Sequence, residues 1–326
     1  MDDIKVGLTP KQRAGNLLGS FGLIAILLII FGFFSLLIPK LYFTWPNLRD
    51  MIRFSSYVGI GAIGMTFCIM TRNFDISVGS MLALAGVLGA SVALKAGGIF
   101  GVIITMAAAT LLGVINGLFV TKLKIPAFIT TLGMYFIFRA LAYIYTNNNP
   151  QYIQDRFWIF LGNGSFLRIP LPIYIMALCY VIAYLMLRKA PFGRYILAIG
   201  TNSRAAALSG INVDNIKILV FTLIGVFVGV SAVLNSSMLG AANPGMMGDG
   251  YEFQVITAVV LGGTALAGGS GSLGGTLIAA MVIVFLKTGM SNAQVNSYWQ
   301  QVATGLVLIV AVSLNKLKFW LIGQTQ

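Results

Sequence analysis

Long apolar runs follow one another along almost the whole chain, separated by short polar stretches. Runs of about 17 to 25 residues are long enough for a helix to cross a hydrocarbon core about 30 Å thick. The pattern predicts an all-α polytopic membrane protein, with residues 1–326 forming a single transmembrane domain. We expect about ten transmembrane helices, at residues 17–38, 55–71, 78–94, 99–120, 125–145, 171–187, 216–234, 253–267, 273–286 and 302–314.

Composition supports this class of protein and changes how its net charge is interpreted. The chain of 326 residues is 58% hydrophobic and 9% charged, whereas soluble domains carry about 25% charged residues. A net charge of +13 would suggest nucleic acid in a soluble protein, but here the basic residues lie in short loops and near both ends. They mark the cytoplasmic side, so we expect contact with membrane lipid and no nucleic-acid partner.

Basic residues also predict the orientation of the chain. The segment 1–16 is basic, precedes the first apolar run and has no signal-peptide cleavage pattern. Lys316 and Lys318 follow the last run. We therefore expect a cytoplasmic N-terminal segment and a cytoplasmic C-terminus, with residues 72–77 forming a tight turn on the same side.

Several kinds of site are excluded by what the sequence lacks. It has no histidine, and Cys68 and Cys179 lie in apolar runs without metal-ligand spacing, so we expect no catalytic residue, metal or cofactor in this chain. No Walker A motif occurs. Residues 269–274 match G-x-G-x-x-G but lie between apolar runs, without the strand that a dinucleotide site needs. We attribute the glycines of residues 262–275 to close helix packing.

Residues 188–212, RKAPFGRYILAIGTNSRAAALSGIN, form a polar and basic island between two apolar runs. Within it we predict a short helix from Asn202 to Gly210. Asn202 or Ser203 can accept from free N–H groups, the alanines favour a helix, and Gly210 can end it. Such a helix suits contact with a partner, but an ordinary connecting loop has the same local signals.

Three polar residues in or beside the apolar runs are candidates for a translocation path, and each has a structural alternative. Arg139 lies inside the fifth run, where an ionised side chain costs at least about 2.5 kcal/mol, unless it snorkels to the outer interface. Glu252 either steers a polar solute or caps a helix. Asn116 either binds hydroxyl groups or joins two helices.

Asp75 and Ser77 precede the third run and complete this set of candidates. A helix cap is the simpler interpretation, with the Asp75 carboxylate accepting a hydrogen bond from the N–H of Val78. We therefore expect Asp75 and Ser77 to form a tight cap.

An internal repeat is also visible. Residues 75–85, DISVGSMLALA, align without gaps with residues 270–280, SGSLGGTLIAA. Related halves around a central path are common in transporters, so we expect a duplication, with chance similarity among small residues as the alternative.

Four stretches carry a resemblance to a known family. They are GMTFCIMTRNFDISVGSMLALAG, KIPAFITTLGM, FGRYILAIGTNSRAAALSGINVDNIKI and YEFQVITAVVLGGTALAGGSGSLGGTLIAA, at residues 64–86, 124–134, 192–218 and 251–280. Together they resemble the permease subunits of bacterial ABC importers for monosaccharides, and residues 209–218 most resemble the ribose type. The chain departs from the family with Asn73-Phe74-Asp75 in place of Gly-Gly-Ile-Asp, and with Phe253-Gln254 in place of Leu-Asp.

The resemblance implies the partners of the chain and the role of its polar island. It implies a permease paired with a second copy, an ABC subunit that binds ATP and Mg²⁺, and a periplasmic sugar-binding protein. It also implies that the island is a coupling loop, residues 188–212, that contacts the ATPase. The residues matching the family pattern there are Asn202, Arg204, Ala205, Ala206, Ser209, Gly210 and Ile211.

Two other classes remain as alternatives. An ion-coupled secondary transporter of a small polar solute usually carries ionisable residues at mid-membrane, yet only Arg139 lies clearly within a predicted span. An intramembrane enzyme would need a nucleophile–base pair or a metal set, and the sequence offers neither.

Overall fold

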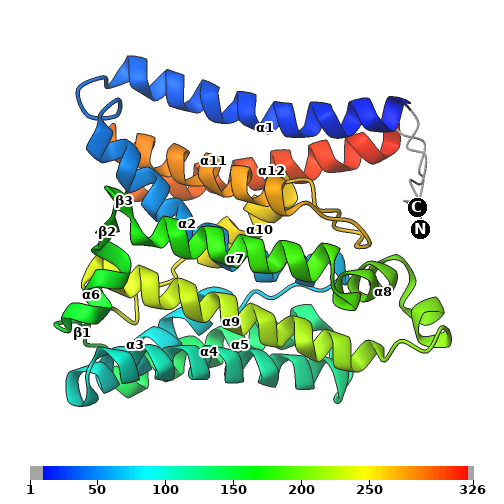
Figure 1. The fold of residues 1–326 in the computed structure, drawn as a ribbon, viewed down its shortest axis with the longest axis horizontal. Coiled ribbons are helices and arrows are strands. Elements are labelled where there is room, and N and C mark those ends of the chain that lie inside the picture. The colour runs from blue at the N-terminus through cyan, green and yellow to red at the C-terminus, as the bar shows by residue number, and fades with distance from the viewer. Residues whose placement is uncertain (1–9, 322–326) are drawn as a thin grey trace.

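The computed structural model describes residues 10–321, and helices make up most of them. The long helices lie side by side along one direction and form a bundle (Figure 1). The all-α class predicted from the apolar runs is confirmed. The helices are α1 (Pro10–Leu37), α2 (Trp45–Met70), α3 (Val78–Ala96), α4 (Gly98–Thr121), α5 (Ala127–Thr146), α6 (Arg156–Asn163), α7 (Leu171–Arg188), α8 (Pro191–Leu208), α9 (Val213–Leu239), α10 (Tyr251–Leu261), α11 (Leu273–Asn292) and α12 (Ser297–Leu321).

Side chains fix the start of several helices. Thr44, Asp155 and Ser272 each accept a hydrogen bond from the backbone N–H three residues ahead, at the starts of α2, α6 and α11. These bonds satisfy N–H groups that have no partner within the helix. Local sequence therefore sets these boundaries before any packing is considered.

Seven of the described helices are long and apolar enough to cross a membrane: α2, α3, α4, α5, α7, α9 and α11. The apolar parts described for α1 and α12 are shorter. The predicted spanning helix at residues 253–267 is wrong, because α10 has 11 residues and is only about 16 Å long at 1.5 Å per residue.

Two non-helical segments run inside the bundle. Residues 71–77 lead from the end of α2 back into the bundle before α3 begins, and residues 243–250 lead inward to the start of α10 (Figure 1). Asp75 and Ser77 are fully buried, so the predicted tight turn at the cytoplasmic surface is wrong. Irregular backbone at membrane depth must be buried in protein or line a wet cavity.

The two ends of the bundle differ. One end carries α6 and two short strand pairs, and we call it the α6 end (Figure 1). The other end, the α8 end, carries α8 together with the start of α1 and the end of α12 (Figure 1). The first nine residues of the predicted cytoplasmic segment 1–16 lie outside the described residues. The strands are β1 (Gln151–Tyr152) paired with β4 (Ala241–Ala242), and β2 (Ser165–Phe166) paired with β3 (Ile169–Pro170).

Small residues allow the helices to pack closely. A Cβ added to Gly113 of α4 would collide with the carbonyl oxygen of Phe221 in α9. In the glycine-rich segment, Gly262 and Gly275 approach each other's backbones in the same way, whereas a Cβ at Gly274 would meet no atom within 4 Å. Close packing is thus confirmed for part of residues 262–275.

Candidate functional site

The helix predicted in the polar island begins at an interruption of α8. The backbone of Asn202 is non-helical and divides α8 into two parts. Its Oδ1 accepts hydrogen bonds from the N–H of Arg204 at 3.1 Å and of Ala205 at 3.0 Å. The predicted N-cap at Asn202 is confirmed.

Gly210 ends this helix in the left-handed conformation, with φ of +84°. The N–H of Gly210 donates to the carbonyl oxygen of Ala207 at 3.0 Å, and that of Ile211 donates to Ala206 at 3.1 Å. This pair of bonds is a Schellman motif, which places the glycine just beyond the last helical turn. The predicted helix end at Gly210 is confirmed.

The helix from Asn202 to Gly210, called here the projecting helix, exposes nearly all of its side chains. Only Ala206 is buried, and Leu208 is 86% exposed. Arg204 is exposed and forms no ion pair with any residue that the structure describes. The projecting helix therefore leaves one large apolar side chain and one cationic side chain open to contact.

A buried polar cluster holds the segment in front of α3. The Asp75 carboxylate accepts from the N–H of Ser77 at 2.8 Å, from the Ser77 hydroxyl at 2.6 Å and from Asn116 Nδ2 at 3.1 Å. Asn116 Nδ2 also donates to Ser77 Oγ at 2.8 Å. The predicted bond to the N–H of Val78 is wrong: Asp75 instead closes a turn before the helix and joins it to α4.

Arg139 binds the second non-helical segment. It lies seven residues before the end of α5 at Thr146, about 10 Å along the helix axis. Its Nη1 donates to the carbonyl oxygens of Pro244 at 2.6 Å and Met247 at 2.8 Å. The guanidinium therefore satisfies backbone groups inside the bundle, which explains its place in an apolar run without snorkelling.

Glu252 lies in the first turn of α10, behind Gly250, and no side chain caps this helix. Glu252 is therefore not the N-cap residue of α10. The residue is 2% exposed, and its Oε2 has no hydrogen-bond partner among the described residues. This oxygen lies against Gly79 in the first turn of α3, so one carboxylate lies between the starts of two helices.

The interior candidates thus converge on the starts of α3 and α10. Sequence reasoning missed Asp249, which is exposed beside them, and Lys287, which is half-buried in α11. Asp249 lies between the predicted spans 216–234 and 253–267, and its position in a Gly-rich polar run before an apolar run gave some indication. Lys287 was missed because its charge ended the predicted span at residue 286, whereas α11 continues to Asn292.

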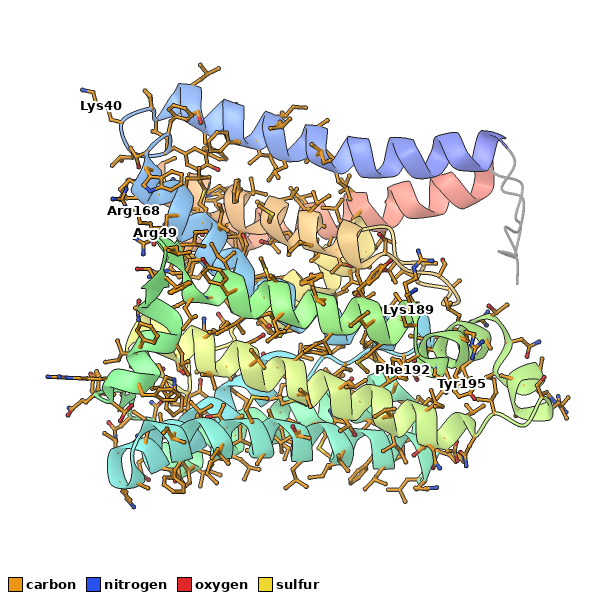
Figure 2. The ribbon with its side chains drawn as sticks, viewed as in Figure 1. Lys40, Arg49, Arg168, Lys189, Phe192 and Tyr195 are labelled. Atoms are coloured by element: carbon orange, nitrogen blue, oxygen red, sulfur yellow. The ribbon has the colours of Figure 1, made fainter. Side chains whose placement is uncertain are left out.

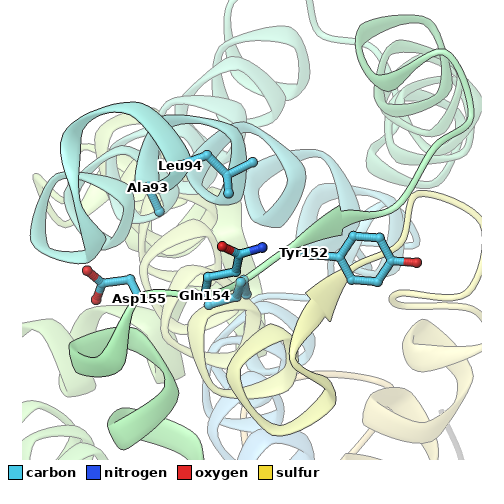
Figure 3. Close-up of a pocket in the computed structure, with 6 residues that line it drawn as sticks. Ala93, Leu94, Tyr152, Gln154 and Asp155 are labelled. Carbon is cyan, nitrogen blue, oxygen red and sulfur yellow. The ribbon is translucent and has the colours of Figure 1, made fainter.

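A pocket at the α6 end does not belong to this interior group. It lies between the end of α3 and the chain leading into α6, and its lining includes Tyr152, Gln154 and Asp155 (Figure 3). Asp155 accepts from the N–H of Trp158 at 3.0 Å, and this bond holds the pKa of Asp155 below its ordinary value. The one carboxylate of the pocket is therefore used as a helix cap.

A comparison with family models decides the class of protein. Residues 47–312 match the family described as the branched-chain amino acid transport system / permease component. The chain belongs to this permease family. The matched region includes the projecting helix and both non-helical segments of the permease.

Curated relatives of the permease agree with this assignment. The ribose import permease protein RbsC of Escherichia coli K12 is 39% identical over 298 residues, 90% of this chain and 92% of that protein. RbsC of Haemophilus influenzae is 40% identical over 291 residues, 88% and 90% of the two chains. The L-arabinose transport system permease protein AraH of Escherichia coli K12 is 33% identical over 316 residues, 93% and 92%. No solved structure matches the permease.

Proposed function

We propose that this permease moves a monosaccharide into the cell across the bacterial inner membrane, as part of an ATP-driven importer, with ribose as the first sugar to test. The observation that carries the proposal is the 39% identity to a ribose import permease over 90% of the chain. In this account ATP and Mg²⁺ are bound by a separate ABC subunit, and a periplasmic binding protein delivers the sugar.

The projecting helix is the proposed contact with the ABC subunit. Coupling between ATP and solute requires an element that touches both the motor and the moving helices. The projecting helix is exposed, capped at both ends, and lies between α7 and α9 in the chain. The coupling residues are Asn202, Arg204, Ala205, Ala206, Ser209, Gly210 and Ile211.

The starts of α3 and α10 are the proposed border of the sugar path. Asp249 is exposed beside them, and a carboxylate facing hydrocarbon would be costly, so this surface faces water or a second copy of the permease. Asp75, Ser77, Asn116 and Arg139 support this border through the bonds described above, and Glu252 through its contact with Gly79. These residues hold the backbone and the starts of α3 and α10 in place, and the sugar passes along the exposed side of this border.

The proposed architecture follows from charge and length. The α8 end faces the cytoplasm, and both termini lie on that side. Ten membrane crossings result when α1, α12 and the unit formed by residues 243–250 with α10 are added to the seven long helices. The loop at the α8 end carries Arg188, Lys189, Arg194 and Arg204, and Arg72 binds that loop, which favours the cytoplasmic side. Basic residues at the α6 end include Lys40, Arg49 and Arg168 (Figure 2). Residues 1–326 form one domain that contacts lipid and pairs as a homodimer, with residues 188–212 as its coupling loop.

The internal repeat stays part of the proposal. Ser77 directly precedes α3, and its aligned counterpart Ser272 directly precedes α11. The two aligned segments therefore both begin helices, which supports a duplication of this unit.

An ion-coupled transporter is the second candidate, and one observation favours it. Asp75 and Glu252 are buried within the bundle, at 0% and 2% exposure, without a cation within ion-pairing distance among the described residues. Buried carboxylates of this kind carry protons in some transporters. The two functions differ in what drives uptake, which makes them separable.

Radiolabelled ribose uptake in cells tests the proposal. Expression of the permease with its ABC subunit and binding protein should give uptake that is lost when the ABC subunit is omitted. A protonophore, applied while cellular ATP is maintained, should leave this uptake unchanged. Uptake that needs the proton gradient but not the ABC subunit would support the second candidate and overturn the first.

A further inference from the structure

A junction at the α8 end joins the projecting helix to the non-helical segment before α3. Arg72, two residues beyond the end of α2, donates from Nε to the carbonyl oxygen of Gly200 at 2.5 Å and from Nη2 to that of Thr201 at 2.9 Å. The planar guanidinium can bind both carbonyls at once. The junction therefore lies directly in front of the interruption at Asn202.

The carbonyl oxygens of Gly200 and Thr201 have no N–H partner within α8 because of how the projecting helix is capped. In a continuous helix they would bind the N–H groups of Arg204 and Ala205, but both of these donate to Asn202 Oδ1. Arg72 supplies the missing donors. The N-cap thus leaves two carbonyl oxygens without helical partners, and Arg72 binds both of them.

The segment after α10 enters the same junction. The N–H of Gly269 donates to the carbonyl oxygen of Met70 at 3.0 Å. A Cβ added to Gly200 would collide with that same oxygen and with the nitrogen of Gly269, and one added to Gly268 would meet the Cγ of Arg72 at 2.5 Å. The end of α2, α8 and the segment that follows α10 therefore meet with no room for another atom.

Arg72 itself adopts a conformation that non-glycine residues seldom take. Its φ is +60°, in the left-handed region. Such a conformation persists where the surroundings fix it, here by the bond from its N–H to Ile69 at 2.9 Å and by its bonds to α8. Because Arg72 is the second residue of the non-helical segment 71–77, its position sets the direction in which that segment enters the bundle.

We propose that Arg72 is the positioning residue that transmits movement of the projecting helix to α3 and α10. Displacement of the projecting helix about Asn202 moves the carbonyls of Gly200 and Thr201. Arg72 carries that movement into residues 71–77, and the Gly268–Gly269 backbone carries it to the end of α10. The inference rests on the proposed contact between the projecting helix and the ABC subunit.

The test compares Arg72→Ala and Arg72→Lys with the control Lys122→Ala. Lys122 is an exposed basic residue directly after α4, outside the coupling loop, with no side-chain hydrogen bond or ion pair among the described residues. Each variant is purified with its ABC subunit, reconstituted with the binding protein, and assayed for radiolabelled ribose moved per ATP hydrolysed. We expect Arg72→Ala to lower this ratio about tenfold or more, a size typical of coupling between sites, while the ABC subunit stays bound.

Arg72→Lys should fall between the wild type and Arg72→Ala, because one ammonium replaces the planar pair of donors. Lys122→Ala should match the wild type. A wild-type ratio of ribose to ATP in Arg72→Ala would overturn the inference, as would loss of the ABC subunit, which would make Arg72 a support for docking alone. If the wild-type complex itself moves ribose without using ATP, the proposed function fails instead.

Discussion

Glu252 and Gly79 lie in contact where the starts of α10 and α3 meet. A Cβ added to Gly79 would collide with Glu252 Oε2 and with the carbonyl oxygen of Gly248. Gly79 and Glu252 are 173 residues apart in the sequence. The starts of α3 and α10 can approach this closely only because residue 79 has no side chain. Helix N-termini carry partial positive charge, which favours a carboxylate between them.

Gly79→Ala should destabilise the permease through this contact. Forcing a methyl group into a filled site costs about 1 to 3 kcal/mol, so the variant should denature at lower temperature in detergent. Gly133→Ala is the matched control, because a Cβ at Gly133 meets no atom within 4 Å. Equal melting temperatures for the two variants would contradict the close approach of α3 and α10.

Asp75 should tolerate an amide better than the loss of its side chain. Asp75→Asn keeps an oxygen that can accept from Ser77, and the free Oδ1 of Asn116 can turn to accept from the new amide. Asp75→Ala leaves buried donors without a partner, which costs about 1 to 3 kcal/mol. Thermal denaturation and uptake should both rank wild type, Asn and Ala in that order. Equal loss of uptake in both variants, at normal stability, would show that the negative charge itself is needed.

Gly210 should be replaceable by asparagine but not by valine. A Cβ at Gly210 meets no atom within 4 Å, but its φ is +84°. Asparagine tolerates this region, whereas a β-branched residue does not. Gly210→Val should therefore release the ABC subunit or uncouple its ATP hydrolysis from uptake, measured by co-purification and ATPase assay. Wild-type behaviour of Gly210→Val would leave the projecting helix as a simple connection.

Reporter fusions should place the two ends of the bundle on opposite sides of the membrane. A cytoplasmic reporter should be active when fused after Gln326 and inactive when fused at Asn148, beyond α5 at the α6 end. The reason is that five proposed membrane crossings, an odd number, lie between Asn148 and Gln326. Activity at both positions would refute the proposed orientation.

Hydropathy predicted the bounds of α3, α4, α5 and α7 to within about two residues, but it placed the start of α2 ten residues too late and did not show how deep the helix ends lie. The runs at 78–94 and 99–120 closely match α3 and α4. Residues 72–77 looked like a surface turn because they are polar, yet Asp75 is buried by Asn116, 41 residues away. A hydropathy plot reports composition and carries no information on such long-range bonds.

Local signals were sufficient for the projecting helix and insufficient for the interior site. The caps at Asn202 and Gly210 involve neighbours within a few residues, so the sequence was enough to predict them. The partners of Arg139 and Arg72 lie more than a hundred residues away. Only the folded chain shows that both arginines bind backbone carbonyl groups.

The most direct test of the account is ribose uptake by the purified complex in lipid vesicles. The vesicles contain the permease and its ABC subunit, and the binding protein lies on the side of the membrane opposite to the ABC subunit. These vesicles should accumulate ribose when ATP and Mg²⁺ are supplied on the side of the ABC subunit. Uptake should stop when a non-hydrolysable ATP analogue replaces ATP. Accumulation without ATP hydrolysis, driven by an imposed ion gradient alone, would contradict the central claim.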